Sequence, residues 1–316
     1  MITLISRRES PNPDFTWSAG FDMDHAILLI QGNKKELHVS KMNFNYARKK
    51  WKGALFALDM ESLGRAISKN DVGISFANES ASFYSFLKKH ARKVMDIGDS
   101  IAAKRSIKRE DEIALVKKAA RKSLGIIRGI HYSKGKTELQ IAKELKMEAL
   151  GQGLELSYEP IVATGANSSF PHSVPTKKRL EGHVLVDFGV KVNGYCGDIT
   201  EVIFLEKRGK AEQAYGKLKQ AFHEIIDNMP DAETGKDADA IYKQAFKKLG
   251  LPEMPHGIGH GLGLEVHEMP RLKAKSDDKI RGATMAIEPA VYVKNRFGVR
   301  FERDILVNKR GKVEIF

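Results

Sequence analysis

Cysteine is nearly absent from this sequence of 316 residues, because Cys196 is the only one. One thiol cannot form an intramolecular disulfide and cannot supply a cysteine-rich metal site, so both are excluded. Cys196 lies in a strand-like stretch, where we interpret it as a packing residue. The chain also has no apolar run near the roughly 18 residues that cross a bilayer.

A secretory signal is missing as well, because the first fifteen residues, MITLISRRESPNPDF, contain no apolar core. The composition is that of an ordinary globular protein, with 42% hydrophobic and 29% charged residues. From these absences we expect a cytoplasmic protein that does not contact a membrane. The length predicts two domains, with a single domain as the alternative.

Acidic residues are fewer than basic ones, which leaves a formal net charge of +13. Residues 1–150 hold 28 Lys and Arg against 17 Asp and Glu, whereas the remainder holds 25 against 23. The excess is densest from Lys104 to Lys122, with the spacing of a solvated helix face. No RNA-binding aromatic motif or zinc finger accompanies it. We therefore interpret it as surface charge, with a nucleic-acid or acidic partner as the alternative.

The pattern changes once along the chain. Residues 15–100 alternate strand-like segments such as HAILLIQ and VGISFA with helical ones, separated by turn signals. A polar, charged stretch follows at residues 101–109. We therefore predict a small α/β domain at residues 1–105 and a second domain at residues 106–316.

The second domain repeats one plan. Helical periodicity covers residues 110–130 and a segment that begins at Thr137 with a capping-box pattern, and a hairpin with Asn193–Gly194 at its turn follows. Two further helices, the second ending at Gly250, precede another hairpin near residues 295–298. The apolar stripe expected on the helix after Thr137 is Leu139, Ala142, Leu145 and Ala149. This order predicts an α+β fold with an internal pseudo-two-fold repeat.

Each hairpin carries two acids in runs that otherwise read as buried. A turn centred between residues 192 and 193 places Asp187 opposite Asp198, and a turn on Asn193–Gly194 shifts the pairing one step with the faces still matched. The same reasoning around residue 295 pairs Glu288 with Glu302. Like charges side by side in a sheet are destabilising, and a cation removes that penalty. Four carboxylates and a histidine suit two divalent ions about 3.5–4 Å apart, Mn²⁺ or a similar ion being favoured over structural zinc.

The segment HGIGHGLGLEVHE, residues 256–268, concentrates three of the ten histidines. His256 and His260 have a spacing that suits a helical metal site. Four alternating glycines oppose a helix, each by roughly 1 kcal/mol, so an extended or loop conformation is predicted.

The segments DFGVKVNGYCGDIT, HGIGHGLGLEVHE, AIEPAVY and GVRFERD, in this order, resemble the pita-bread metallopeptidases, a family of methionine aminopeptidases, aminopeptidases P and prolidases. The resemblance implies a pita-bread (creatinase/aminopeptidase) catalytic domain. It implies that the metal ligands are Asp187, Asp198, His260, Glu288 and Glu302. It also implies that His172, within ANSSFPHSVP, and His267 are catalytic, that His256 is a substrate-side histidine, and that Glu288 carries a proton. Arg300 precedes Glu302 by two positions, so we expect it on the same face, steadying the carboxylates or binding substrate.

The N-terminal segment FTWSAGFDMDHAILLI resembles the first domain of creatinase and prolidase relatives. It favours a peptidase that cleaves an N-terminal Xaa-Pro bond of dipeptides or short peptides by attack of a hydroxide bridging two metal ions. The resemblance implies Mn²⁺ or Co²⁺, with Zn²⁺ or Fe²⁺ as alternatives, and a homodimer. Prolidase and aminopeptidase P both stay open, and a methionine aminopeptidase or a non-catalytic binding protein is the alternative. Glu201 replaces an arginine of many relatives, which leaves the substrate preference open.

Overall fold

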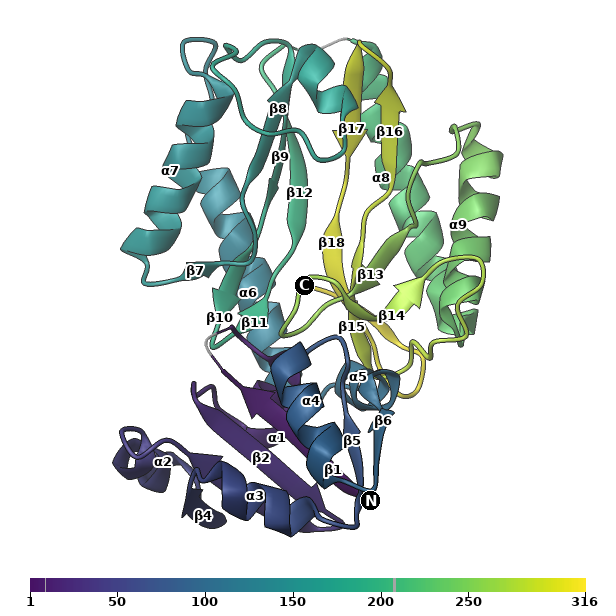
Figure 1. Cartoon of the computed structure of the whole chain (residues 1–316). Helices are drawn as coiled ribbons and strands as arrows, with labels where there is room; N and C mark the ends of the chain where they lie inside the picture. Colours follow the sequence, from purple (N-terminus) through teal and green to yellow (C-terminus); the bar gives the residue numbers. More distant parts are fainter. Residues whose placement is uncertain (9, 207–208) are drawn as a thin grey trace. The chain divides into compact units, whose positions relative to one another are not determined.

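The computed structural model describes residues 1–8, 10–206 and 209–316. The chain divides into two compact units, Met1–Arg105 and Ser106–Phe316 (Figure 1). Among the described residues, no helix combines the length and the apolar character that spanning a membrane requires.

A mixed sheet with the strand order β4-β3-β2-β1-β5-β6 forms the centre of the unit Met1–Arg105. Its elements are β1 (Ile2–Arg7), α1 (Pro13–Ala19), β2 (Ala26–Gln31), β3 (Lys34–Val39), α2 (Phe44–Lys50), β4 (Ala54–Ala57), α3 (Met60–Ile67), β5 (Asp71–Ile74), α4 (Ala81–His90), β6 (Lys93–Asp96) and α5 (Gly98–Ser106). Successive residues of β2 enter different apolar clusters, Ile27 and Leu29 one, Leu28 the other. Both faces of the sheet are therefore covered, which explains the continuous apolar run of β2.

The first half of the unit Ser106–Phe316 packs two helices against a sheet of order β12-β9-β8. Its elements are α6 (Glu110–Gly129), α7 (Glu138–Gly151), β7 (Glu155–Leu156), β8 (Ile161–Thr164), the 3₁₀ turn η1 (Gly165–Ser169), β9 (His183–Phe188), β10 (Val190–Val192), β11 (Tyr195–Cys196) and β12 (Ile199–Phe204). Thr137 caps α7 with the predicted capping box. The predicted stripe of α7 is wrong at Leu139, which is 36% exposed, because the helix buries Ile141 instead.

The second half places two further helices against a sheet of order β14-β13-β15-β18-β19. Its elements are α8 (Lys210–Asn228), the 3₁₀ turn η2 (Met229–Asp231), α9 (Gly235–Leu249), β13 (Gly259–Gly261), β14 (Glu268–Leu272), β15 (Ala283–Ile287), β16 (Ala290–Val293), β17 (Phe297–Arg300), β18 (Arg303–Val307) and β19 (Val313–Ile315). The C-cap of α9 is Gly250 in the left-handed conformation, as the sequence predicted.

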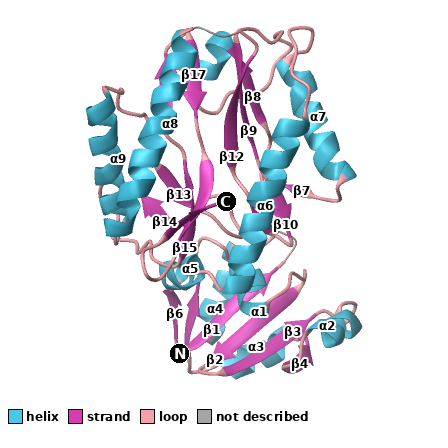
Figure 2. Cartoon of the chain, turned by 180° about the vertical axis from the view of Figure 1, so that it is seen from behind, coloured by secondary structure: helices cyan, strands magenta, loops and turns pink. Residues whose placement is uncertain are grey.

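The two halves follow the same order of two helices and then a long hairpin. Figure 2 shows α6 and α8 on the near side of the strands, with α7 further out beside α6 and α9 further out beside α8. An isolated bridge between Thr200 and Glu302 joins the two hairpins. The predicted α+β class with an internal repeat is confirmed, and the bridge lies where the acids of the two halves meet.

Candidate active site

The first hairpin turns on Asn193–Gly194, both with positive φ, the backbone of a two-residue hairpin turn. Of the two predicted turn positions, the one on Asn193–Gly194 is therefore correct, and the strand pairing places Asp187 opposite Thr200. Asp198 lies two residues before Thr200, on the same face of the strand, so the two aspartates are neighbours.

The ladder of this hairpin is interrupted beside Asp198. A Cβ atom on Gly189 would lie 2.0 Å from the carbonyl oxygen of Gly197, so only glycine permits the strands to approach and bend at this point. The N–H of Asp198 donates a 2.9 Å hydrogen bond to Oδ2 of Asp304, on β18 of the other hairpin. The bend thus turns Asp198 towards the second half of the unit.

The second hairpin keeps one register, centred on residue 295, through both of its strand pairs. Glu288 and Glu302 lie between these pairs and are opposite each other, as predicted. Pro289 follows Glu288 and has no N–H to donate, which interrupts the ladder at this position. Both hairpins therefore bend at their acids.

His260 is the central residue of β13, which lies between β14 and β15. A Cβ atom on Gly259 would lie 1.9 Å from the carbonyl oxygen of Ala286, so the glycines let this short strand fit between its neighbours. The predicted extended conformation is confirmed. His260 Nε2 lies 3.6 Å from Oδ2 of Asp198 and 4.0 Å from Oε1 of Glu288.

These side chains face a cavity of about 620 Å³ within the unit Ser106–Phe316. Its polar lining comprises Asp187, Asp198, His260, Glu288, Glu302, Arg300, His172, His267 and Tyr158, together with Lys146, Glu159 and Ser173. Apolar residues of α7, β8 and the loop after η1 line the remainder, among them Leu139, Ile161 and Val174. Eight of the nine residues predicted for the site thus line one cavity, although they come from five separate segments.

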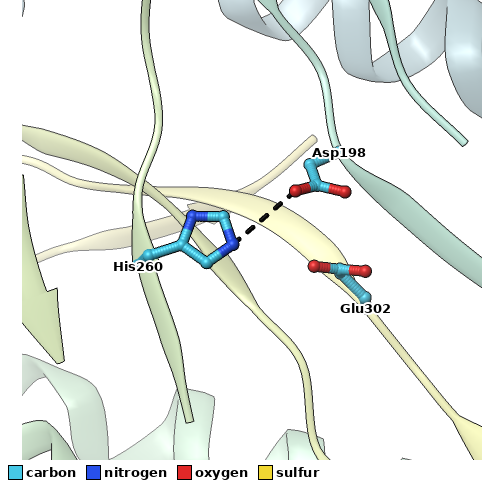
Figure 3. A group of neighbouring side chains, drawn as sticks. All are labelled: Asp198, His260 and Glu302. Atoms are coloured by element: carbon cyan, nitrogen blue, oxygen red, sulfur yellow. Dashed lines mark ion pairs between the residues drawn. The ribbon is translucent and has the colours of Figure 1, made fainter. Parts of the chain in front are cut away.

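Within this cavity Asp198, His260 and Glu302 form the tightest cluster (Figure 3). One ligand atom from each lies within 4.8 Å of the others. Figure 3 shows the imidazole of His260 directed at the two carboxylates, which come from different hairpins. The other two predicted carboxylate ligands, Asp187 and Glu288, lie beside this cluster in the same cavity.

Electrostatics makes the cluster unfavourable without cations. Burial raises the pKa of Asp198 well above its usual range, with Glu302 and Asp187 adding repulsion. Burial likewise raises the pKa of Glu302 to about 7. Burial and His267 lower the pKa of His260 to about 3, so its ring is neutral and available as a ligand. Oxygen donors with one neutral imidazole fit divalent ions such as Mn²⁺, so these residues fit the expected metal.

Arg300 is a positively charged side chain among these carboxylates, and it is only 2% exposed. Its Nη2 lies 2.5 Å from Oδ2 of Asp187, and its Nε donates a 3.0 Å hydrogen bond to Oγ1 of Thr200. The hydroxyl of Thr200 in turn donates to Oε2 of Glu302 at 2.5 Å. Arg300 and Thr200 therefore contact one carboxylate from each hairpin.

Sequence reasoning missed Tyr158, which lies in the loop between β7 and β8. Its hydroxyl contacts Oδ1 of Asp187 and lies 2.5 Å from Oδ1 of Asp198. Burial and these two carboxylates raise the pKa of Tyr158 well above its usual range, so it remains a donor. A phenol has a single proton and therefore donates to one aspartate at a time.

The three further histidines occupy different positions. His172 is exposed at the cavity, in the loop after η1. The ring of His267 lies 4.1 Å from that of His260, centroid to centroid. His256 is the exception, because it is not among the described residues that line the cavity. Its Nδ1 lies 3.9 Å from Oε2 of Glu288, and its Nε2 lies 3.3 Å from the hydroxyl of Tyr292, which accepts a 2.7 Å hydrogen bond from Nη1 of Arg300. His256 therefore borders the site beside Glu288.

The departure at Glu201 does not alter the cavity. Glu201 neighbours Thr200 on β12, so its side chain lies on the opposite face of the strand. It forms an ion pair with Arg303 and accepts a 3.1 Å hydrogen bond from the hydroxyl of Tyr215. Glu201 is thus not among the described residues that line the cavity, and the substrate preference stays open. Cys196 is fully buried in the core, as a packing residue is.

A buried carboxylate and imidazole cluster in a cavity is the kind of centre that metallohydrolases use. Residues 114–309 match the model of metallopeptidase family M24. This match covers more than half of the chain, so the protein belongs to metallopeptidase family M24 and is a peptidase of that family. The predicted resemblance to the pita-bread metallopeptidases is confirmed.

Relatives known by sequence include an uncharacterized peptidase of Methanocaldococcus jannaschii, 34% identical over 239 residues, and the uncharacterized peptidase YqhT of Bacillus subtilis, 32% identical over 233 residues. These alignments cover 72% and 69% of this chain, and 68% and 64% of the relatives, so the second falls just short of two thirds of that protein.

Solved structures with a similar fold include an X-Pro aminopeptidase of Thermotoga maritima and an Xaa-Pro dipeptidase of Bacillus anthracis. Each of the two has a TM-score of 0.88 and is 26% identical in sequence to this chain. The superpositions cover 99% of this chain, and 94% and 92% of the aminopeptidase and dipeptidase chains respectively. The prolidase of Pyrococcus horikoshii is similar at a TM-score of 0.86. The predicted fold, a pita-bread catalytic domain preceded by a small α/β domain, is therefore confirmed.

Proposed function

We propose that this protein is an exopeptidase that requires two divalent metal ions and hydrolyses the bond between an N-terminal residue and a following proline. The observation that carries the proposal is the convergence of four carboxylates, His260, His172, His267 and Arg300 on one cavity. The similarity to an X-Pro aminopeptidase and an Xaa-Pro dipeptidase supports the proline preference. Dipeptides and short peptides are both proposed as substrates.

Asp187, Asp198, His260, Glu288 and Glu302 are proposed to hold the ions. When bound, such ions polarise the scissile carbonyl and lower the pKa of water to near neutrality. Mn²⁺ or Co²⁺ is proposed because the donors are four carboxylates and one imidazole, with Zn²⁺ or Fe²⁺ as alternatives.

The side chains around these ligands divide the remaining tasks. Glu288 takes a proton from the attacking water and delivers it to the leaving nitrogen, since its carboxylate lies in the cavity beside His260. His267 donates a hydrogen bond to the developing oxyanion. His172, in the loop after η1, orients the substrate. His256 supports the substrate side through Tyr292 and Arg300.

The test uses purified protein loaded with Mn²⁺ or Co²⁺ and compares an Xaa-Pro dipeptide, an Xaa-Pro-Yaa tripeptide and a Met-Ala peptide. We expect cleavage of the proline substrates, and the ratio of the first two distinguishes a dipeptidase from an aminopeptidase. Asp198→Ala should abolish activity and lower metal content. Asp239→Ala is the matched control, because Asp239 is a buried aspartate of α9 that pairs with Lys243.

Preference for Met-Ala would replace this proposal with a methionine aminopeptidase. Absence of peptidase activity in the metal-loaded protein, together with salt-sensitive RNA binding, would replace it with a binding protein. A homodimer and a cytoplasmic location are part of the proposal, and sedimentation and cell fractionation test them.

A further inference from the structure

Glu138, the first residue of α7, is a buried carboxylate outside the proposed metal site. It is fully buried, and no lysine, arginine or histidine among the described residues forms an ion pair with it. An unpaired buried charge is tolerated only when hydrogen bonds compensate it. The position of these hydrogen bonds therefore indicates what the residue does.

The compensating donors come from two points on one segment. On the near side, Oε1 accepts hydrogen bonds from the N–H of Thr164 at 2.9 Å and from Nδ2 of Asn167 at 3.0 Å. On the far side, Oε2 accepts from the N–H of Thr176 at 3.0 Å and from its hydroxyl at 2.6 Å. One carboxylate thus joins the start and the end of residues 164–176.

His172 lies between these two points, in the part of the segment that borders the cavity. Within the described chain, its ring has no hydrogen-bond partner of its own, so the backbone alone fixes its position. The beginning of the segment has a second anchor, since the N–H of Gly298 donates to Oγ of Ser168 at 2.8 Å. The end of the segment is attached at Thr176, to Glu138 and to the N–H of Leu139.

We propose that Glu138 is a positioning residue that holds His172 at the cavity by fixing both ends of the segment 164–176. The effect on catalysis rests on the proposed function, because it operates through the role of His172 towards substrate. The effect on the loop does not depend on that function. Displacing a substrate-orienting group by about 1 Å costs up to roughly a hundredfold in rate.

The principal variant is Glu138→Gln, which keeps the shape of the side chain. Its amide group is a donor and confronts the donors of Asn167 or Thr176, so part of the hydrogen-bond set is lost. We expect hydrogen exchange of residues 165–176 to accelerate at least tenfold and kcat/KM for an Xaa-Pro substrate to fall about tenfold or more. Mn²⁺ affinity should stay unchanged.

Two further variants separate positioning from stability. Glu112→Gln is the matched control, because Glu112 is also a buried carboxylate, lies on a different helix, α6, and accepts a 2.6 Å hydrogen bond from the hydroxyl of Tyr195 on β11. It should leave exchange of residues 165–176 unchanged. Thr176→Val removes the 2.6 Å bond at an exposed position, so it folds even where Glu138→Gln does not, and it should shift both readouts in the same direction.

The decisive measurement is kcat/KM of the double variant Glu138→Gln/His172→Ala. If Glu138 acts through His172, the double variant has the same kcat/KM as His172→Ala alone. Multiplicative losses in the double variant, or unchanged exchange in both Glu138→Gln and Thr176→Val, would overturn the inference. Wild-type protein without activity on Xaa-Pro substrates would instead overturn the proposed function, and the exchange experiment would still decide the inference about the loop.

Discussion

Lys108→Met tests whether a buried ion pair supports the loop that carries His267. Lys108 Nζ lies 2.7 Å from Oε1 of Glu268, and both side chains are 1% exposed. Glu268 directly follows His267 and occupies space beside Gly263, where a Cβ atom would lie 2.6 Å from its carboxylate. Methionine keeps much of the apolar stem of lysine but removes the charge that faces Glu268.

Removing one partner of a buried ion pair typically costs about 3–5 kcal/mol of unfolding free energy. Replacing both partners by apolar residues is often close to neutral. We therefore expect Lys108→Met to lose about 3–5 kcal/mol, and Lys108→Met/Glu268→Met to regain most of that loss. Lower kcat should accompany the single variant because His267 is adjacent.

The assay is urea unfolding followed by two signals. Both tryptophans, Trp17 and Trp51, lie in the unit Met1–Arg105, so their fluorescence reports that unit, while far-UV circular dichroism reports both. Arg105→Met is the matched control, since Arg105 pairs with Asp14 at 2.9 Å with side chains 4% and 3% exposed. It should shift the fluorescence transition, whereas Lys108→Met should shift only the dichroism transition.

A loss below about 1 kcal/mol in Lys108→Met would refute the reasoning, because an effect of that size is typical of a solvated pair. A Lys108→Met/Glu268→Met variant that is less stable than Lys108→Met would also refute the reasoning, because the carboxylate of Glu268 would then not be the source of the lost stability.

Three further predictions concern separate parts of the chain. Tyr158→Phe should weaken Mn²⁺ affinity by roughly tenfold in calorimetry, because residues that orient ligands typically contribute that much, and Tyr195→Phe should not. Burial raises the pKa of Glu79 to about 7, above its value in the unfolded chain. The contribution of protonated Glu79 to folding stability is therefore present at low pH and is lost as pH rises through about 7. Glu79→Gln should therefore flatten the pH dependence of fluorescence-monitored stability between about pH 5 and pH 8, and an unchanged slope would contradict this. Glu201→Arg should lower stability by about 2–3 kcal/mol by facing Arg303, and Glu201→Arg/Arg303→Glu should restore it with kcat/KM unchanged.

Much of the fold could be predicted because its signals are local. Asn193–Gly194 favours positive φ at two successive positions, and this fixes the turn and therefore the side of the strand on which Asp187 and Asp198 lie. The alternating glycines around His260 excluded a helix for the same local reason. Helix caps at Thr137 and Gly250 depend only on neighbouring backbone groups.

Other features could not be predicted because they depend on distant contacts. Periodicity assigned Leu139 to the core of α7, but the neighbouring elements bury Ile141, and Leu139 borders the cavity. Nothing near Tyr158 indicates that its hydroxyl contacts two aspartates 29 and 40 positions later. The ion pair of Glu201 with Arg303 joins positions 102 residues apart, which no local pattern indicates.

The sequence by itself determined the repeated order of helices and hairpins and the acids on each hairpin, since these follow from patterns within about twenty residues. Only the tertiary structure decided which of those acids meet. Bends at Gly189 and Pro289 and the bridge between Thr200 and Glu302 bring the two hairpins together. It also revealed Glu138, whose hydrogen bonds reach across 38 positions to Thr176, because burial and hydrogen-bond satisfaction are properties of the packed chain.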